Sequence, residues 1–223
     1  MKRTVSLFLL FMTMMSANAQ SHQSIRDSLS EAIRLTDLYP DSVELKLKKA
    51  SWNMMLKEWQ RAKDEYDNVL QLDPLNAAAL YFRAYANEQM RRYSFARADY
   101  EKLLQLLPQD FRARLGLALL NQKDNRTNVA YDQMNQLVTQ FPDSALAYAA
   151  RGGLEMAQDM MELAEYDYSK AIELEPTNTD FLINRVAIRI MLGRKKEARE
   201  DLDRMVQLGV SRANLLEYYR RVK

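Results

Sequence analysis

Apolar side chains recur at intervals of four residues in a stretch that returns several times along the chain. The best preserved copy, residues 164–176, reads AEYDYSKAIELEP and places Ala164, Tyr168 and Ile172 on one stripe. A stripe with this spacing is typical of an amphipathic helix that buries one face. Similar stretches span residues 62–74, 96–108, 130–142 and 198–210. The pattern therefore predicts a series of related helices.

The copies keep a constant spacing. The five prolines follow one another at steps of 34 residues, at Pro40, Pro74, Pro108, Pro142 and Pro176. Five alanines keep the same step, at Ala62, Ala96, Ala130, Ala164 and Ala198. A fixed period of this size indicates a repeat architecture. With position 1 of the first repeat at Val43, five repeats span residues 43–76, 77–110, 111–144, 145–178 and 179–212.

Each repeat is predicted to contain two helices. Position 34 always carries a side chain that can cap a helix N-terminus, in the order Ser42, Asn76, Asp110, Ser144, Asn178. The proline two residues earlier ends the preceding helix. Position 20 is always alanine, and position 8 is a small or slim residue, in the order Ala50, Ala84, Ala118, Gly152, Val186. Small residues at both positions would let the two helix backbones approach closely.

With these positions, the sequence resembles the tetratricopeptide repeat proteins over residues 43–212. Small residues at position 8, alanine at 20, an aromatic residue at 24 and proline at 32 carry the resemblance. Local departures include Lys46 and Arg114 at position 4, Met134 at position 24 and Val210 in place of the last proline. The resemblance implies an all-α fold, a right-handed superhelical α-solenoid of antiparallel helix pairs. It also implies a concave groove lined by the first helices, where family members bind peptides or protein segments.

Positions 7 and 23 change together. Position 7 is basic in repeats one, two, four and five (Lys49, Arg83, Arg151, Arg185), and position 23 is then acidic (Glu65, Asp99, Asp167, Asp201). In the third repeat Leu117 and Gln133 replace both charges. We expect ion pairs between the two helices of the four charged repeats; the alternative is independent surface charges.

The ends of the chain differ from the repeats. Residues 1–19 are predicted to be a signal peptide, because Lys2 and Arg3 precede a short apolar run and a small-x-small site before cleavage at about Ala19/Gln20. Residues 20–42 are expected to form a capping helix, a half repeat whose first helix was given up to the signal peptide. Residues 213–223 are expected to form a second cap. The mature protein is expected in a bacterial periplasm, or secreted; an uncleaved anchor is the alternative.

Composition argues against several kinds of function. Without residues 1–19 the chain holds 30 basic and 30 acidic residues, which lacks the basic excess of a nucleic-acid surface or of attraction to anionic lipid. The chain has no cysteine, and its only histidine is His22, so no usual zinc site and no catalytic triad on a rigid element are predicted. We expect no catalytic residues, no metal and no cofactor, and no membrane insertion after cleavage.

By the resemblance, positions 2, 5, 6, 9, 12 and 13 face the groove. The predicted partner-binding residues are Leu47, Met54, Tyr81, Phe82, Tyr85, Leu115, Leu119, Met156 and Ile183. Position 5 is never lysine and position 9 is never asparagine, so the clamp with which some relatives hold a C-terminal carboxylate is missing. An apolar, aromatic patch typically marks an interaction site. The alternative is that these side chains pack against neighbouring helices and leave a shallow wall.

Three functions are compatible with these features. The first is a scaffold in the bacterial envelope that binds a peptide or helix of a partner protein, with an accessory subunit of an outer-membrane assembly or uptake complex as a variant. The second is a structural or self-associating module whose groove is filled by its own C-terminal helix or by another copy. The third is an enzyme or enzyme subunit, for which no site is visible.

Overall fold

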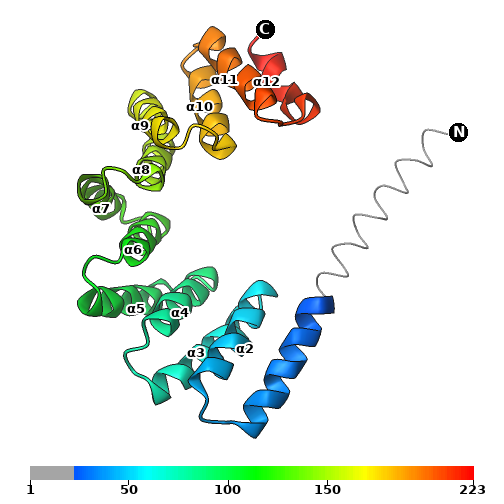
Figure 1. Cartoon of the computed structure of the whole chain (residues 1–223). Coiled ribbons are helices and arrows are strands. Elements are labelled where there is room, and N and C mark those ends of the chain that lie inside the picture. The colour runs from blue at the N-terminus through cyan, green and yellow to red at the C-terminus, as the bar shows by residue number, and fades with distance from the viewer. Residues whose placement is uncertain (1–22) are drawn as a thin grey trace, which may run out of the picture. The chain divides into compact units, whose positions relative to one another are not determined.

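The structure, a computed structural model, describes residues 23–223, and within this range it contains helices and no strand. The predicted all-α fold is confirmed, and the chain is a helical-repeat solenoid (Figure 1). The first described element is an N-terminal helix over residues 23–38, where the half repeat is predicted. The predicted signal peptide and His22 lie outside the described residues. The right-handed superhelical path stays a prediction.

Each predicted repeat is one helical hairpin. The first helices are α2 (Val43–Met55), α4 (Ala77–Gln89), α6 (Phe111–Lys123), α8 (Ala145–Ala157) and α10 (Thr179–Met191). The second helices are α3 (Trp59–Leu72), α5 (Tyr93–Leu106), α7 (Thr127–Gln140), α9 (Met161–Leu174) and α11 (Lys195–Gln207). The C-terminal cap consists of a short 3-10 helix, η1 (Arg212–Leu215), followed by α12 (Leu216–Arg221).

Side-chain caps start the first helices. Asn76 Oδ1 accepts a hydrogen bond from the Ala79 amide at 2.9 Å, and the other predicted capping residues accept equivalent bonds. The second helices begin without a side-chain cap. They follow a tight turn in which the residue at position 15 has a positive φ, as at Lys57 (59°) and Gly193 (73°). The Glu58 amide then bonds to the Asn53 carbonyl, which ends α2 in a Schellman motif.

The core follows the small residues at positions 8 and 20. In the first repeat, Ala50 of α2 and Ala62 of α3 are fully buried in one cluster with Tyr66. A Cβ added to Gly152 would lie 3.1 Å from the ring of Tyr168, so the two helices of the fourth repeat approach closely there. Close approach excludes water from the helix pair and buries the apolar stripe of the second helix.

The four predicted ion pairs between the helices of a repeat are confirmed. They join Lys49 to Glu65 at 2.7 Å, Arg83 to Asp99 at 2.5 Å, Arg151 to Asp167 at 2.7 Å and Arg185 to Asp201 at 2.6 Å. In the third repeat, Asn121 instead donates a hydrogen bond to Gln133. The three aspartates are buried. These pairs are therefore not the weak surface pairs that the sequence alone left possible.

The same arginines also reach the preceding repeat. The Nη1 atoms of Arg83, Arg151 and Arg185 donate to the side chains of Asp67, Asn135 and Ser169, each sixteen residues earlier. In the C-terminal cap, the Tyr219 hydroxyl donates to Asp203 over the same sixteen-residue step, at 2.6 Å. In these repeats, one position of the first helix thus joins the second helix of its own repeat to the second helix of the repeat before.

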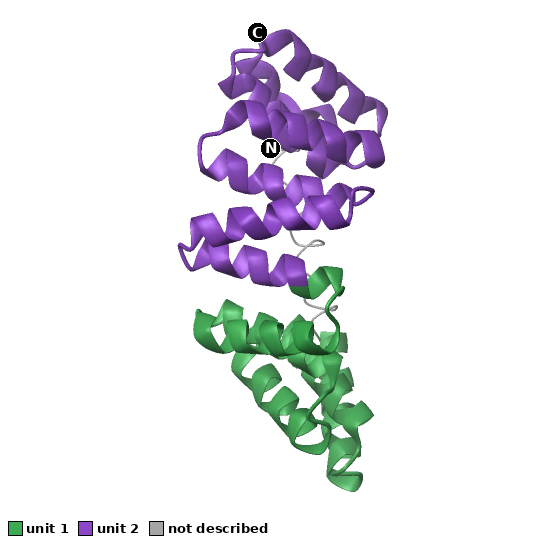
Figure 2. Cartoon of the chain, turned by 90° about the vertical axis from the view of Figure 1, so that its left-hand side faces the viewer, with its two compact units in different colours: residues 1–113 green, residues 114–223 purple. Residues whose placement is uncertain are grey.

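The chain divides into two compact units (Figure 2). Compact unit 1 ends at Ala113, three residues into α6, and compact unit 2 begins at Arg114. A core cluster of compact unit 1 lies between α2, α3 and the start of α4. A larger one in compact unit 2 extends from α8 to the C-terminal cap. No helix among residues 23–223 is both long enough and apolar enough to span a membrane.

Candidate partner-binding site

The nine predicted partner-binding residues all lie on first helices, and none of them is fully buried. Compact unit 1 holds Leu47, Met54, Tyr81, Phe82 and Tyr85, and compact unit 2 holds Leu115, Leu119, Met156 and Ile183. Phe82 and Tyr85 are the most accessible aromatic members, at 40% and 38% exposure. A groove that runs along all nine residues stays a prediction.

The structure brings the α4 aromatic side chains together with aromatic residues of the second helices. The rings of Tyr81 and Phe82 meet edge to face, with centroids 5.2 Å apart. Phe82 stacks on Tyr66 of α3 at 6.0 Å, and Tyr81 meets Tyr100 of α5 edge to face at 5.9 Å. Because one face of Phe82 rests on a fully buried tyrosine, its exposed part is held in a fixed orientation.

Tyr85 points to a different neighbour. Its ring meets Trp59 of α3 edge to face, with centroids 6.1 Å apart. Tyr85 therefore lies one helical turn along α4 from Phe82 and continues the same accessible aromatic surface. Together, Tyr81, Phe82 and Tyr85 form what we call the α4 aromatic surface.

A pocket of about 240 Å³ opens beside this surface, in compact unit 1. It is lined by Ala77, Ala78, Tyr81, Phe82, Leu103, Leu107, Asp110 and Arg112. We call it the α4 pocket. Its volume is below the roughly 300–1,000 Å³ of typical small-molecule sites. A volume of this size corresponds to roughly one or two large side chains.

Arg112 supplies a cation at the mouth of the α4 pocket. Its guanidinium lies 5.5 Å from the Tyr81 ring centroid, in a cation–π contact, and its side chain is 70% exposed. Asp110 lies 3.8 Å away but is occupied with capping α6. Burial raises the pKa of Tyr81, and Arg112 opposes this in part. The phenol thus stays neutral at physiological pH and remains available as a hydrogen-bond donor.

Four of the predicted residues pack partly into the cores. Leu47 and Met54 rest against the cluster around Tyr66, and Met156 and Ile183 rest against the cluster of compact unit 2. These side chains present only part of their surface to solvent, as the shallow-wall alternative expects. Their role in binding a partner stays a prediction.

A separate polar cluster is buried around Glu155 of α8, which is 2% exposed. The Tyr131 hydroxyl of α7 donates to Glu155 Oε1 at 3.3 Å, and Arg151 Nε lies 3.9 Å from the same atom. Glu155 Oε2 has no hydrogen-bond partner. Burial and the neighbouring Asp167 carboxylate raise the pKa of Glu155 to about 7. The cluster belongs to the packing between the third and fourth repeats.

Several of these residues were not predicted from the sequence. Tyr66, Trp59 and Arg112 all contribute to the α4 aromatic surface or pocket, and the first two lie on a second helix. Arg112 stands at a groove-facing position, but the predicted set contains only apolar and aromatic residues. The cluster at Glu155 had a visible signal, because position 11 is polar in every repeat: Asn53, Asn87, Asn121, Glu155 and Arg189.

Comparisons with known proteins agree with this architecture. No family model and no curated protein matches the chain. Among solved structures, a tetratricopeptide repeat protein from Parabacteroides merdae is similar over 91% of this chain and 79% of its own, with 21% identity and a TM-score of 0.73. A thermophilic tetratricopeptide repeat protein of Thermus thermophilus is similar over 81% of this chain and 99% of its own, with 15% identity and a TM-score of 0.64.

A third structure was described together with a ligand site. YrrB, a tetratricopeptide repeat protein with an unusual peptide-binding site, is similar over 85% of this chain and 97% of its own, with 18% identity and a TM-score of 0.56. At these identities the likeness concerns the fold alone. With the 34-residue hairpins, the capped first helices and the small-residue contacts, these matches show that the chain has the fold of the tetratricopeptide repeat proteins.

Proposed function

We propose that this protein is a non-catalytic scaffold that binds a peptide or helix of a partner protein on its first-helix face. The α4 aromatic surface and the adjoining α4 pocket would form the centre of this contact. The chain would act in the bacterial envelope, after removal of residues 1–19. The fold is one in which other proteins bind peptides, as the description of YrrB states for that protein.

The observation that carries this proposal is the fixed, accessible ring of Phe82 beside an open pocket. Phe82 keeps 40% of its surface exposed although its inner face is stacked on Tyr66. Interaction sites are enriched in aromatic residues and arginine, because a pre-ordered ring buries much apolar area at little entropic cost. Arg112 at the pocket mouth adds a cation for a carboxylate or a backbone carbonyl of the bound segment.

The chemistry of the surface limits the bound segment. Six of the eight lining residues are apolar or aromatic, so the segment should insert one large apolar side chain between Tyr81, Leu103 and Leu107. The exposed guanidinium of Arg112 favours an acidic side chain or a carbonyl oxygen next to that apolar residue. A large apolar side chain next to an acidic side chain or a carbonyl oxygen is a feature of a protein segment rather than of a nucleic acid or a lipid.

In-cell photo-crosslinking tests this proposal. A photo-reactive amino acid replaces Phe82 in one variant and Ala98, exposed on the second helix α5, in the control variant. Cross-linking to one defined envelope protein from position 82 but not from position 98 is expected. Loss of that product in an Arg112→Glu background would assign the contact to the α4 pocket.

Other outcomes would replace the proposal. Crosslinks from position 82 to a second copy of the chain would favour the self-associating module. Products from position 98 alone would retire the α4 aromatic surface as a binding site. A partner that belongs to an outer-membrane assembly or uptake complex would refine the scaffold to an accessory subunit of that complex.

A further inference from the structure

The N-terminal helix (residues 23–38) has the register of a second helix. Ser28, Ala32 and Leu35 stand at the positions that Ala62, Tyr66 and Val69 hold 34 residues later in α3. Those three α3 residues are 0%, 1% and 0% exposed, because they pack in one cluster with Ala50 of α2 and Ala79 of α4. On the N-terminal helix Ala32 is already buried, at 2% exposure, whereas Ser28 and Leu35 are only partly buried; among residues 23–223 no helix precedes this one.

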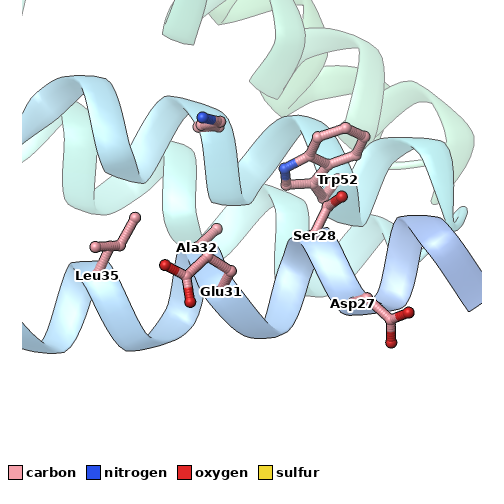
Figure 3. A pocket seen from close by; sticks show the side chains of 7 residues that line it. Asp27, Ser28, Glu31, Ala32, Leu35 and Trp52 are labelled. Carbon is pink, nitrogen blue, oxygen red and sulfur yellow. The ribbon is translucent and has the colours of Figure 1, made fainter.

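A pocket of about 410 Å³ marks this place, between the N-terminal helix and α2. It is lined by Asp27, Ser28, Glu31, Ala32, Leu35, Lys48 and Trp52. Figure 3 shows Ser28, Ala32 and Leu35 directed from their helix towards α2, with the Trp52 indole above Ser28. We call this the N-terminal pocket, and it shares no lining residue with the α4 pocket.

Trp52 indicates that the packing around this pocket is incomplete. Its indole Nε1–H is buried yet has no hydrogen-bond partner. The Trp52 side chain as a whole is only partly buried, and it lines the pocket. The residues at the same position in the next four repeats, Ala86, Leu120, Leu154 and Ile188, are fully buried and need no hydrogen-bond partner.

The complete repeats show which side chains fill the equivalent place. In four of them, a basic residue of the first helix, followed directly by a small or slim residue, binds the acid at position 23, as Arg151 binds Asp167. Glu31 is the acid at that position in the N-terminal helix. It pairs with Arg34 on its own helix, and both side chains are more than half exposed. Glu31 is therefore accessible to a cation from a helix laid over the pocket.

We propose that the N-terminal pocket receives a helix of a partner protein, which completes the half repeat as a first helix would. The incoming helix carries a lysine or arginine followed directly by alanine or glycine. The cation pairs with Glu31, and the small residue lies over Ser28 and Ala32. This site is independent of the α4 pocket and of the function proposed above.

The segments near the two ends of this chain fit the site less well than such a partner helix. In the C-terminal cap, Tyr219 stands at position 7, which is basic in four repeats, and Arg220 stands at position 8, which is small or slim in all five. The Tyr219 hydroxyl already donates a hydrogen bond to Asp203. In the sequence before the N-terminal helix, Met15 stands at the basic position. Neither segment offers a cation before a small residue. The complementary helix is therefore expected from another protein.

A fluorescence titration tests this proposal in the full chain. The chain has two tryptophans, so a Trp59→Phe variant leaves Trp52 as the only reporter. The probe is a capped synthetic peptide with the sequence of residues 76–90, which contains Arg83 followed by Ala84 and no tryptophan. We expect a saturable shift of the Trp52 emission to shorter wavelength as the peptide covers the indole.

Two matched changes test the specificity of binding. A peptide with Arg83→Glu should bind about three- to tenfold more weakly, because it loses a charge-assisted hydrogen bond to Glu31. A Glu31→Lys protein should reverse this preference. A peptide with Ala84→Trp should bind at least about tenfold more weakly, since the large side chain overpacks the contact.

The protein variant Ala32→Tyr provides the remaining control. It places in the pocket the residue that α3, α5 and α9 carry at this position, and peptide binding should be lost. Because Ala32 is only 2% exposed, circular dichroism of the variant is compared with that of the wild type to separate loss of binding from loss of the fold. No saturable shift with the peptide, or equal affinity for the Arg83→Glu peptide, overturns the proposal. Dimerisation in sedimentation that Ala32→Tyr abolishes would assign the pocket to a second copy and also overturn it. None of these results depends on crosslinking at Phe82.

Discussion

Arg151 of α8 and Asp167 of α9 form a two-pronged ion pair, in which Nε and Nη2 each donate to one carboxylate oxygen at 2.7 Å. Asp167 is only 1% exposed, and Arg151 extends further to Asn135 of α7. One guanidinium thus joins three helices. A buried carboxylate at this place depends on its cation, because the guanidinium offsets the cost of its desolvation.

Replacing Arg151 with leucine, the residue at the same position of the third repeat, tests this dependence on the cation. Arg151→Leu should destabilise the protein by about 3–5 kcal/mol, because it leaves Asp167 buried without its cation. The double change Arg151→Leu with Asp167→Gln reproduces the Leu117 and Gln133 pair of the third repeat. It should recover most of the loss in urea denaturation. An equal loss in both variants would show that the arginine acts through packing and not through its charge.

The raised pKa of Glu155 predicts a specific pH dependence. Its pKa is about 7 in the folded protein and near 4.5 ordinarily, so between these values the folded state retains a proton that the unfolded state has lost. The contribution of Glu155 to the free energy of unfolding is therefore complete below about pH 4.5. It falls by on the order of 3 kcal/mol as the pH rises from there through about 7. The groups that face it are the charged Arg151 and Asp167 and the neutral Tyr131 phenol.

A Glu155→Gln variant isolates this contribution. The amide keeps the shape of the side chain but does not titrate. The stability of the variant relative to the wild type should therefore increase as the pH rises from 5 to 8. The measurement is the difference between the two urea midpoints across that range. Parallel pH profiles for the two proteins would show that Glu155 is ionised throughout.

Two glycines of the chain should respond differently to alanine. A Cβ on Gly153 would meet only the Tyr168 hydroxyl, at an ordinary 3.5 Å. Gly153→Ala should therefore raise the free energy of unfolding by about 0.5–1 kcal/mol through helix propensity. At Gly193, with φ +73°, the same change should destabilise the protein despite open space around it. Thermal melts of both variants check this, and a destabilised Gly153→Ala protein would contradict the expected fit.

The turns at position 15 contain a conformational cost that glycine would remove. Lys57, exposed, has φ 59°, in the region where an L side chain is disfavoured. Lys57→Gly should stabilise the protein by about 0.5–1 kcal/mol, since Gly193 already holds this position in the fifth repeat. Ser51→Gly, an exposed change inside α2, is the matched control and should destabilise by a similar amount. Destabilisation by both changes would show that the Lys57 side chain makes a contact worth more than the strain.

The sequence was most informative where the repeats could be compared with one another. Positions 7 and 23 were paired correctly because five copies of one hairpin show which residues change together, as Leu117 and Gln133 do in the third. The capping residues were found for the same reason, since each is fixed by local backbone chemistry. Hairpin geometry depends only on residues within about 34 positions, and the sequence samples it five times.

Contacts between successive repeats were harder to predict. The stacking of Phe82 on Tyr66, and the cation–π contact of Arg112 with Tyr81, depend on how one hairpin is rotated against the next. That rotation is set by side-chain volumes at many positions and has no short sequence signature. The N-terminal pocket likewise follows from Ala32 standing where α3 has Tyr66.

The sixteen-residue reach of Arg83, Arg151 and Arg185 has a consequence for how such a gene lengthens. Each arginine finds both of its partners at positions that recur in every copy, so duplicating a block of 34 codons supplies the donor and the acceptors together. The new junction then resembles the old ones, as Tyr219 and Asp203 illustrate at the last of them. Selection can therefore change the length of this molecule in whole steps without first evolving a new interface.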